Sequence, residues 1–173
     1  MSRLFIAVWP PAWVVDELRE LPRKDQRGVR FVRPDDWHVT LRFLGDAHPG
    51  AVEAALDGIA VAPARVRLGP AVDVLAERAL VVPVDGLDSV AGEVIARTRE
   101  LGDRPRRRFV GHLTVARLKP FADVPRALGA LFQAEFELAE IALVESRLHP
   151  DGARYTTIAT WPVSPGAGVR ATW

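Results

Sequence analysis

The chain has 173 residues, of which 49% are hydrophobic and 26% are charged, and its formal net charge is +1. These values are typical of one globular domain, or of two small lobes that share a core, and they exclude a global positive field that would attract nucleic acid. The absence of cysteine excludes disulfides, thiolate metal sites and a cysteine nucleophile.

The N-terminal segment is predicted to be a buried strand and not a targeting sequence. Leu4 to Trp9 form a short, continuous apolar run that ends at Pro10 and Pro11. Such a run is too short for the core of a signal peptide and for a membrane span. We therefore expect a cytoplasmic protein that does not bind membranes.

The rest of the chain alternates short strands with a few helices. Helices are predicted after Pro11 and over 51–59, 87–101 and 125–132. Strands are predicted at 31–32, at two histidine-containing segments, and over 66–75, 80–84, 136–144 and 155–161. This order predicts an α+β fold in which mostly antiparallel sheets carry helices on their outer faces.

A tripeptide pattern, His-x-Thr, occurs twice, each time in an apolar run. His38 and Thr40 lie within HVTLRFLG, whereas His112 and Thr114 lie within HLTVARLK, 74 positions later (112 − 38). Residues i and i+2 of a strand point to the same face, so each copy presents an imidazole and a hydroxyl together. The half-chain spacing is consistent with a duplicated, pseudo-two-fold unit.

Two histidines that face each other across a cleft can cleave a phosphodiester without a metal. One ring takes a proton from water and the other protonates the leaving oxygen, because imidazole titrates near pH 6.5. Threonine hydroxyls can donate to phosphate oxygens, and an arginine can add a bidentate clamp. Arg42, four residues after His38, should share the face of that histidine. Arg117, five residues after its histidine, needs a bulge, a strand end or its long side chain to do so.

A single histidine in an apolar strand is more often a core residue than a catalytic one. Two copies in matching frames use half of the four histidines and favour function. A zinc site would require a third ligand, yet His48 and His149 lie in turns, and the sequence contains no HxH or HExxH motif. We therefore expect neither a metal nor a cofactor.

Aromatic and basic residues near the two motifs are candidate substrate contacts. Arg42 is one of them. A terminal base could stack on Trp37, Phe43, Phe109 or Tyr155, although alternation places Trp37 on the opposite face from His38. Four arginines precede the second motif and could either guide the phosphates of an RNA strand or form a solvated loop: Arg104, Arg106, Arg107 and Arg108.

These segments resemble the 2H phosphoesterase superfamily, and more narrowly its RNA 2′,3′-cyclic phosphodiesterases, which are also called 2′-5′ RNA ligases. The resemblance runs over RLFIAVWPP, both His-x-Thr segments and ESRLHPDGARYTTIATW, and so covers nearly the whole chain. The family often has proline immediately before the second histidine, where this chain has Gly111.

The resemblance implies one α+β domain over residues 1–173, built as two lobes. Two antiparallel sheets would form a V-shaped cleft with helices on the outer faces and one His-x-Thr motif from each lobe. His38 would be the general acid toward the ribose 3′ oxygen and His112 the base toward water, while Thr40, Thr114 and Arg117 would hold the phosphate.

The implied activity is metal-independent hydrolysis of RNA 2′,3′-cyclic phosphate ends to 2′-phosphate, with reversible 2′-5′ joining in some members. We expect a monomer that binds RNA ends or nucleoside 2′,3′-cyclic phosphates. Two other interpretations stay open. The same chemistry could act on a non-RNA cyclic phosphate or on a 2′-5′ oligonucleotide, or the cleft could bind RNA ends without turnover.

Overall fold

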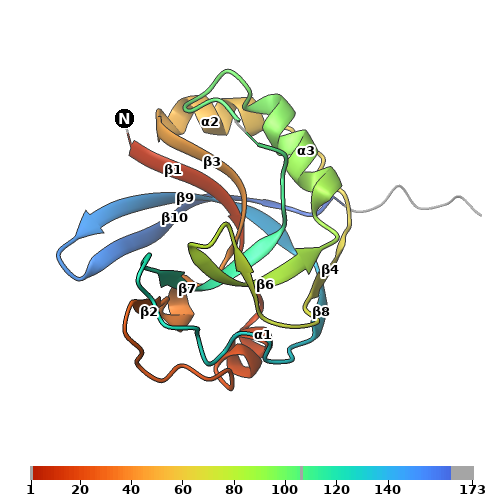
Figure 1. Ribbon diagram of the computed structural model, residues 1–173. Coiled ribbons are helices and arrows are strands. Elements are labelled where there is room, and N and C mark those ends of the chain that lie inside the picture. The colour runs from red at the N-terminus through yellow and green to blue at the C-terminus, as the bar shows by residue number, and fades with distance from the viewer. Residues whose placement is uncertain (1, 106, 165–173) are drawn as a thin grey trace, which may run out of the picture.

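The computed structural model describes residues 2–105 and 107–164, which form one large sheet with three α-helices against it (Figure 1). The elements are, in chain order, β1 (Ser2–Val8), α1 (Ala12–Leu18), β2 (Val29–Phe31), a 3-10 turn (Pro34–Asp36), β3 (Val39–Ala47), α2 (Pro49–Leu56), β4 (Arg65–Leu68), β5 (Asp73–Leu75), β6 (Ala79–Asp85), α3 (Asp88–Arg97), β7 (His112–Leu118), β8 (Ala134–Glu137), β9 (Glu140–His149) and β10 (Gly152–Pro162). All pairings between these strands are antiparallel, which confirms the predicted α+β class.

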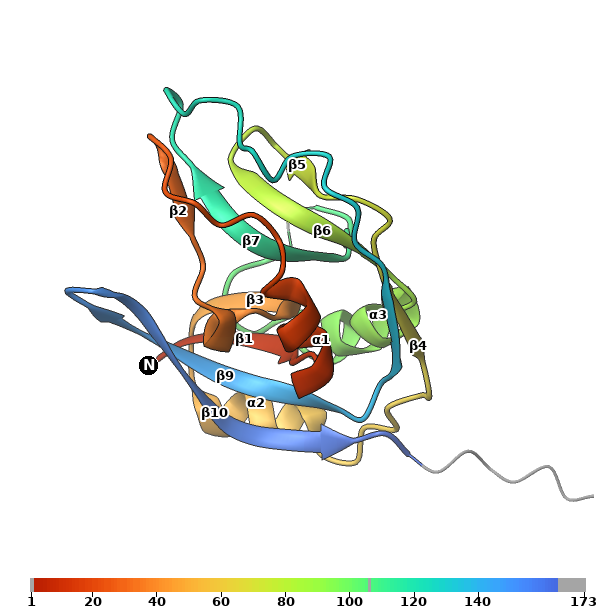
Figure 2. The same ribbon diagram turned by 90° about the horizontal axis from the view of Figure 1, so that it is seen from below.

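The sheet is curled, and the two His-x-Thr segments meet at its centre. Its strand order is β10-β9-β1-β3-β7-β6-β4-β8, with β2 paired to β7 and β5 paired to β6. The register between β3 and β7 comprises one residue pair, Val39 with Leu113, each of which is the middle residue of its motif. Figure 2 shows the β9–β10 hairpin and the β2–β7 pair projecting to the same side of the molecule.

Two apolar clusters lie on opposite faces of β1 and β9, because both strands alternate apolar side chains on both sides. The main core includes Leu4, Ile6, Val8, Ile141 and Leu143, and the buried faces of the three helices pack into it. A smaller cluster on the other face contains Phe5, Ala7, Ala142 and Val144, with Trp9 and Tyr155 packed against it. The smaller cluster is the apolar floor on which the site described below is built.

The predicted helix over 125–132 is wrong, because this segment forms isolated turns and its other main-chain hydrogen bonds go to another loop. Gly129 donates to the carbonyl of Val72, Val72 donates to Ala130, and Phe132 donates to Pro70. Its exposed apolar side chains therefore form no buried stripe: Val124, Leu128 and Leu131 face solvent. The predicted helix over 87–101 is confirmed, but it ends at Arg97.

Two predicted strands are each split in two. The segment 66–75 contains β4 and β5, separated by Gly69-Pro70, because proline has no N–H to donate to a sheet. The segment 136–144 is divided between β8 and β9 by Leu138, which donates to the carbonyl of Ala64. The turn at 149–152 is the predicted hairpin connection between β9 and β10.

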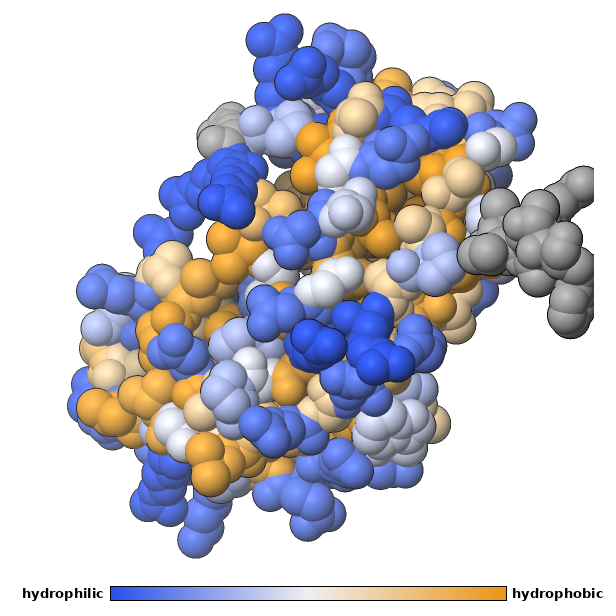
Figure 3. All heavy atoms as spheres, turned by 90° about the vertical axis from the view of Figure 1, so that its right-hand side faces the viewer, coloured by the Kyte–Doolittle hydropathy of each residue, from blue (hydrophilic) through white to orange (hydrophobic). Residues whose placement is uncertain are grey.

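The surface is mixed in character. The face seen in Figure 3 carries hydrophobic residues interspersed with hydrophilic ones. None of the helices among the described residues is long and apolar enough to cross a membrane.

Candidate active site

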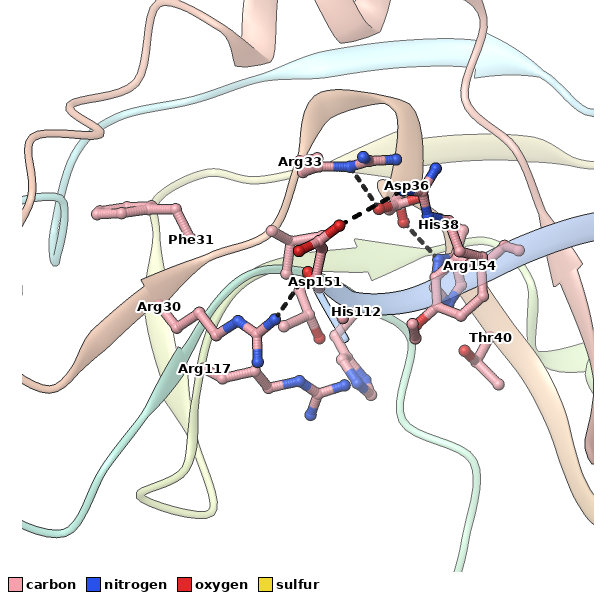
Figure 4. Close-up of a pocket in the computed structure, with 15 residues that line it drawn as sticks. Arg30, Phe31, Arg33, Asp36, His38, Thr40, His112, Arg117, Asp151 and Arg154 are labelled. Carbon is pink, nitrogen blue, oxygen red and sulfur yellow. Dashed lines mark hydrogen bonds and ion pairs between the residues drawn. The ribbon is translucent and has the colours of Figure 1, made fainter. Parts of the chain in front are cut away.

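A cavity of about 260 Å³ lies where β3 and β7 meet, beneath β2 and the β9–β10 hairpin (Figure 4). It is lined by the histidine and threonine of each motif and by residues of β2, of the segment after it, of β7 and of the β9–β10 hairpin, most of them charged or aromatic. The lining residues are Arg30, Phe31, Val32, Arg33, Asp36, His38, Thr40, His112, Thr114, Arg117, Asp151, Gly152, Ala153, Arg154 and Tyr155. The structure therefore brings together both predicted histidines, both threonines, Arg117 and Tyr155.

The register at the centre of the sheet explains how the two motifs meet. Val39 pairs with Leu113, so one step along an antiparallel pair brings Thr40 toward His112 and His38 toward Thr114. Each imidazole thus has the hydroxyl of the other motif as a neighbour across the strands. The middle residues, Val39 and Leu113, are buried on the opposite face.

Both histidines are held by the same main-chain device. His38 Nδ1 lies 2.7 Å from the carbonyl oxygen of Asp36, and His112 Nδ1 lies 2.7 Å from the carbonyl oxygen of Val110, in each case two residues earlier. A carbonyl oxygen only accepts, so Nδ1 must carry the proton and donate it. Nε2 of each ring is therefore the atom free to accept or give a proton in the cavity.

His38 lies in an aromatic enclosure. Its ring centroid is 4.8 Å from that of Phe5, 5.4 Å from that of Trp9 and 5.3 Å from that of Tyr155. Burial lowers the pKa of His38 below its usual 6.5, and the positive charges of Arg117 and His112 lower it further, while the Asp36 carbonyl and carboxylate act in the opposite direction. The neutral ring is therefore favoured in the free protein.

A β-bulge brings Arg117 to the face that simple alternation denies it. Leu80 pairs with Ala116 and Val81 with Thr114, so Val115 is an extra residue in β7. Val115 and Ala116 are consequently both buried, and the next residue, Arg117, returns to the side of the cavity. Of the three routes that the sequence left open, the bulge is the one the structure uses.

A β-bulge in β3 turns Arg42 away from the cavity, so the expectation that Arg42 shares the face of His38 is wrong. Ile6 pairs with Arg42 and Ala7 with Thr40, which makes Leu41 an extra residue in β3. The Arg42 side chain is 5% exposed. Its guanidinium donates to the carbonyls of Phe43, Leu101 and Asp103, at 2.8, 3.2 and 2.5 Å. Arg42 thus fastens β3 to the segment that leads toward the second motif.

Trp37 and Phe43, two predicted base-stacking residues, lie outside the cavity. Trp37 is 1% exposed and packs in the main core, with the Arg23 guanidinium 5.5 Å from the ring centroid. Phe43 is 42% exposed and has the Arg3 guanidinium 5.4 Å from its ring centroid. Tyr155 is the aromatic candidate that lines the cavity, and burial raises the pKa of its hydroxyl, which stays protonated and able to donate.

The arginine-rich segment before the second motif borders a separate hollow. Arg104, Arg107 and Phe109 line it together with Phe43, and Arg106 lies outside the described residues. At the end of this segment Gly111 passes close to β6, where a Cβ would overlap the carbonyl oxygen of Val84. This contact accounts for glycine where the family often has proline.

Three arginines of the cavity were not predicted from the sequence: Arg30, Arg33 and Arg154. Arg30 comes from β2, whose pairing with β7 is set by long-range contacts, and Arg154 from the β9–β10 hairpin. Basic residues in short exposed segments carry no periodicity that would indicate a cavity. Within the described ranges no three His, Cys, Asp or Glu side chains gather in a way that could hold a metal ion.

The comparison with family models matches residues 8–70 to the LigT-like phosphoesterases. The match contains the first His-x-Thr motif, whereas the second motif lies beyond it. The structure places this second motif beside the first in one cavity, although it lies outside the matched residues.

Two curated relatives carry the name RNA 2′,3′-cyclic phosphodiesterase. The protein of Methanocaldococcus jannaschii is 25% identical over 173 residues, which cover 92% of this chain and 99% of the relative. That of Archaeoglobus fulgidus is 27% identical over 168 residues, which cover 88% and 96% of the two chains.

Solved structures of LigT share the fold. E. coli LigT in complex with 3′-AMP superposes with a TM-score of 0.74 at 22% identity, over 95% of this chain and 99% of that chain. At this identity the likeness concerns the fold alone. The family model, the curated relatives and the fold agree that the chain is similar to the LigT-like 2H phosphoesterases.

Proposed function

We propose that this protein hydrolyses RNA 2′,3′-cyclic phosphate ends to 2′-phosphates by a metal-independent reaction of His38 and His112. The observation that supports the proposal is that both imidazoles line one cavity, which Thr40, Thr114 and Arg117 also line, while their Nδ1 atoms are engaged by main-chain carbonyls. Titratable rings held by carbonyls suit proton transfer, and hydroxyl and guanidinium donors suit a phosphoryl group whose charge grows in the transition state.

The proposed step breaks one P–O bond and forms another. Neutral His112 accepts a proton from water as the water oxygen attacks phosphorus. Protonated His38 gives its Nε2 proton to the ribose 3′ oxygen as the P–O3′ bond breaks, which leaves a 2′-phosphate. Thr40, Thr114 and Arg117 hold the phosphoryl oxygens throughout. Joining a 2′,3′-cyclic end to a 5′ hydroxyl follows the same course: the hydroxyl replaces water as the nucleophile, the P–O3′ bond breaks, and the two histidines keep their roles. Cleavage of the resulting 2′-5′ linkage is the reverse reaction, in which the two roles are exchanged.

The lowered pKa of His38 fits a general acid that becomes protonated when the substrate binds. In the free protein the pKa of His38 is lowered by burial, so its acid form is scarce near neutral pH. A bound cyclic phosphate places a negative charge beside the ring and favours the imidazolium again. We propose that the proton needed by the leaving group is taken up as the substrate binds.

Relatives and fold support the substrate class. The two curated relatives are named for RNA 2′,3′-cyclic phosphate chemistry, and E. coli LigT has been solved with a 3′-nucleotide. We also propose that the chain is one domain of two lobes that acts as a monomer, because one chain supplies both histidines and their phosphate-binding partners.

Product analysis on adenosine 2′,3′-cyclic phosphate tests the proposal. We expect adenosine 2′-phosphate as the product and a rate that does not change with a chelator. His38→Ala and His112→Ala should each lower kcat/KM by about 10²- to 10⁴-fold, the usual contribution of general acid–base catalysis. His48→Ala is the matched control, because His48 is exposed at the start of α2, away from the cavity.

Three outcomes would contradict the proposal. Full activity in either cavity variant would remove the histidines from the mechanism. Tight binding of RNA ends with no turnover would make the protein a binding module. A strong preference for a cyclic phosphate that is not part of an RNA end, measured as relative kcat/KM over a panel, would change the substrate.

A further inference from the structure

Two arginines face each other directly across neighbouring strands at the edge of the cavity. In the antiparallel register of β2 and β7, Arg30 pairs with Arg117. Both side chains line the cavity and therefore extend from the same face of the sheet. The Cβ atoms of such a pair lie about 5 Å apart, and like charges in this position destabilise a sheet by a few tenths of a kcal/mol to about 1 kcal/mol. This repulsion needs a counterion.

The carboxylates of the cavity do not supply that counterion. The ion pairs found among the described residues include neither Arg30 nor Arg117. Asp36 pairs with Arg33 at 3.2 Å, and Asp151 pairs with His149 at 3.3 Å and with Arg154 at 4.0 Å. Arg30 instead donates to the main-chain carbonyl of Asp151 at 3.5 Å, which carries no net charge.

The two guanidinium groups diverge from their shared base. Figure 4 shows the Arg117 side chain running toward His112, whereas the Arg30 side chain turns toward Asp151 on the β9–β10 hairpin. One phosphate held between the histidines by Arg117 and the two threonines would leave Arg30 without an anion. The cavity thus offers a second cationic position, at its outer end beneath the hairpin.

An RNA end carries a second negative charge on the same ribose as its cyclic phosphate. The terminal ribose bears the cyclic phosphate on its 2′ and 3′ oxygens and the phosphodiester to the preceding nucleotide on its 5′ oxygen. A nucleoside 2′,3′-cyclic phosphate lacks that 5′-phosphate. We propose that Arg30 binds the 5′-phosphate of the terminal nucleotide and thereby selects RNA ends over free nucleoside 2′,3′-cyclic phosphates, an inference that rests on the proposed function.

Two substrates that differ only in the second phosphate test this proposal. We would compare adenosine 2′,3′-cyclic phosphate with its 5′-phosphorylated form and express the result as the ratio of their kcat/KM values. The natural protein should favour the 5′-phosphorylated substrate by about tenfold or more, the usual effect of a hydrogen bond to a charged group. Arg30→Ala should lower this ratio about tenfold, and Arg99→Ala, an exposed control in the turn after α3, should leave it unchanged.

A structural role for Arg30 predicts a different pattern. If Arg30 served to hold β2 on β7, its removal would lower the free energy of unfolding and affect both substrates alike. The like-charge pairing predicts the contrary, that Arg30→Ala unfolds at the same or a higher urea concentration than the natural protein. The proposal also predicts that kcat/KM falls more steeply with salt concentration for the 5′-phosphorylated substrate, because salt screens the additional charge pair, and that Arg30→Ala removes this difference.

An unchanged substrate ratio in Arg30→Ala would overturn the proposal. A natural protein that turns over neither substrate would instead overturn the proposed function. In that case calorimetric binding of adenosine 2′,5′-bisphosphate against adenosine 2′-phosphate decides the subsite by itself. A tenfold tighter bisphosphate complex that is lost in Arg30→Ala would support it, whereas equal affinities would reject it.

Discussion

The strands β3 and β7 carry the same motif and the same two local devices, yet they build different surroundings for their histidines. In each, the carbonyl two residues before the histidine accepts from Nδ1, and an extra residue three positions after the histidine makes a bulge. His38 then rests on aromatic rings of β1 and β10, whereas Arg117 of β7 runs toward His112 (Figure 4). The motif and its bulge therefore set the orientation of each ring, whereas the neighbouring strands determine which residues surround it.

The bulges also lead to opposite results for the arginines. In β3 the residue after the bulge is Arg42, which becomes buried and binds three carbonyls. In β7 that place is taken by Ala116, and the arginine comes one position later, on the side of the cavity. A shift of one position in sequence therefore separates an arginine that holds the fold from one placed to hold a phosphate.

The largest expected difference between the two strands is in proton donation. p-Nitrophenolate leaves as an anion, so a p-nitrophenyl phosphodiester needs no general acid. His38→Ala should therefore recover at least about 100-fold on the p-nitrophenyl ester of a nucleoside 2′-phosphate, relative to its loss on the cyclic phosphate. His112→Ala should lose activity equally on both substrates, measured by release of p-nitrophenolate and by chromatography. Recovery in His112→Ala instead would exchange the two roles.

A second comparison sets the two arginines against each other. Arg117→Ala should lower kcat/KM by roughly 10- to 100-fold, the usual effect of losing a hydrogen bond to a charged group, and should unfold at the same or a higher urea concentration than the natural protein. Arg42→Met keeps the apolar stem but leaves the carbonyls of Phe43, Leu101 and Asp103 without their donor. It should lower the free energy of unfolding by about 1–3 kcal/mol. A stable Arg42→Met protein, or an unstable Arg117→Ala protein, would reverse the division between the two arginines.

The smallest effect is the contribution of His38 to the pH dependence of stability. Its pKa is lowered in the folded protein, so the unfolded chain binds more protons just below pH 6.5. The stability that depends on the neutral ring is therefore fully present above pH 6.5 and is lost as pH falls toward the folded-state pKa. Urea unfolding from pH 5 to 8 should show this decline in the natural protein and a weaker one in His38→Gln. If the free energy of unfolding fell equally with decreasing pH in both proteins, the His38 ring would not be buried in its neutral form.

Much of this site could be predicted because its central signal is local. Strand alternation places each histidine with its threonine, and the repeat places a second pair in the same fold. The same reasoning failed at Arg42, since a bulge arises from the pairing of β3 with β1 and leaves no mark in a single segment. Arg30 was missed for a related reason, because its partner in the sheet is 87 positions away (117 − 30).

The fold shows the same division between local and distant causes. The strand at 4–9 and the helix beginning near Leu87 follow from apolar periodicity, and the structure contains both. The segment 125–132 has a similar share of apolar residues but uses its backbone groups on the loop around Val72. Apolar periodicity predicts which face of a segment is buried, but it does not predict the hydrogen bonds that the segment forms with a distant loop.

The carbonyl clamps of the two histidines have a consequence for how such sites vary. Asp36 and Val110 share no side-chain chemistry, yet each orients an imidazole equally well, because only the peptide oxygen is used. Aiming a general acid or base in this way places no demand on the side chain two positions upstream. A protein engineer could therefore redesign Val110 for solubility or stability while His112 keeps its orientation. At Asp36 the same change would keep the orientation of His38 but would remove the ion pair with Arg33 and a carboxylate that raises the pKa of His38.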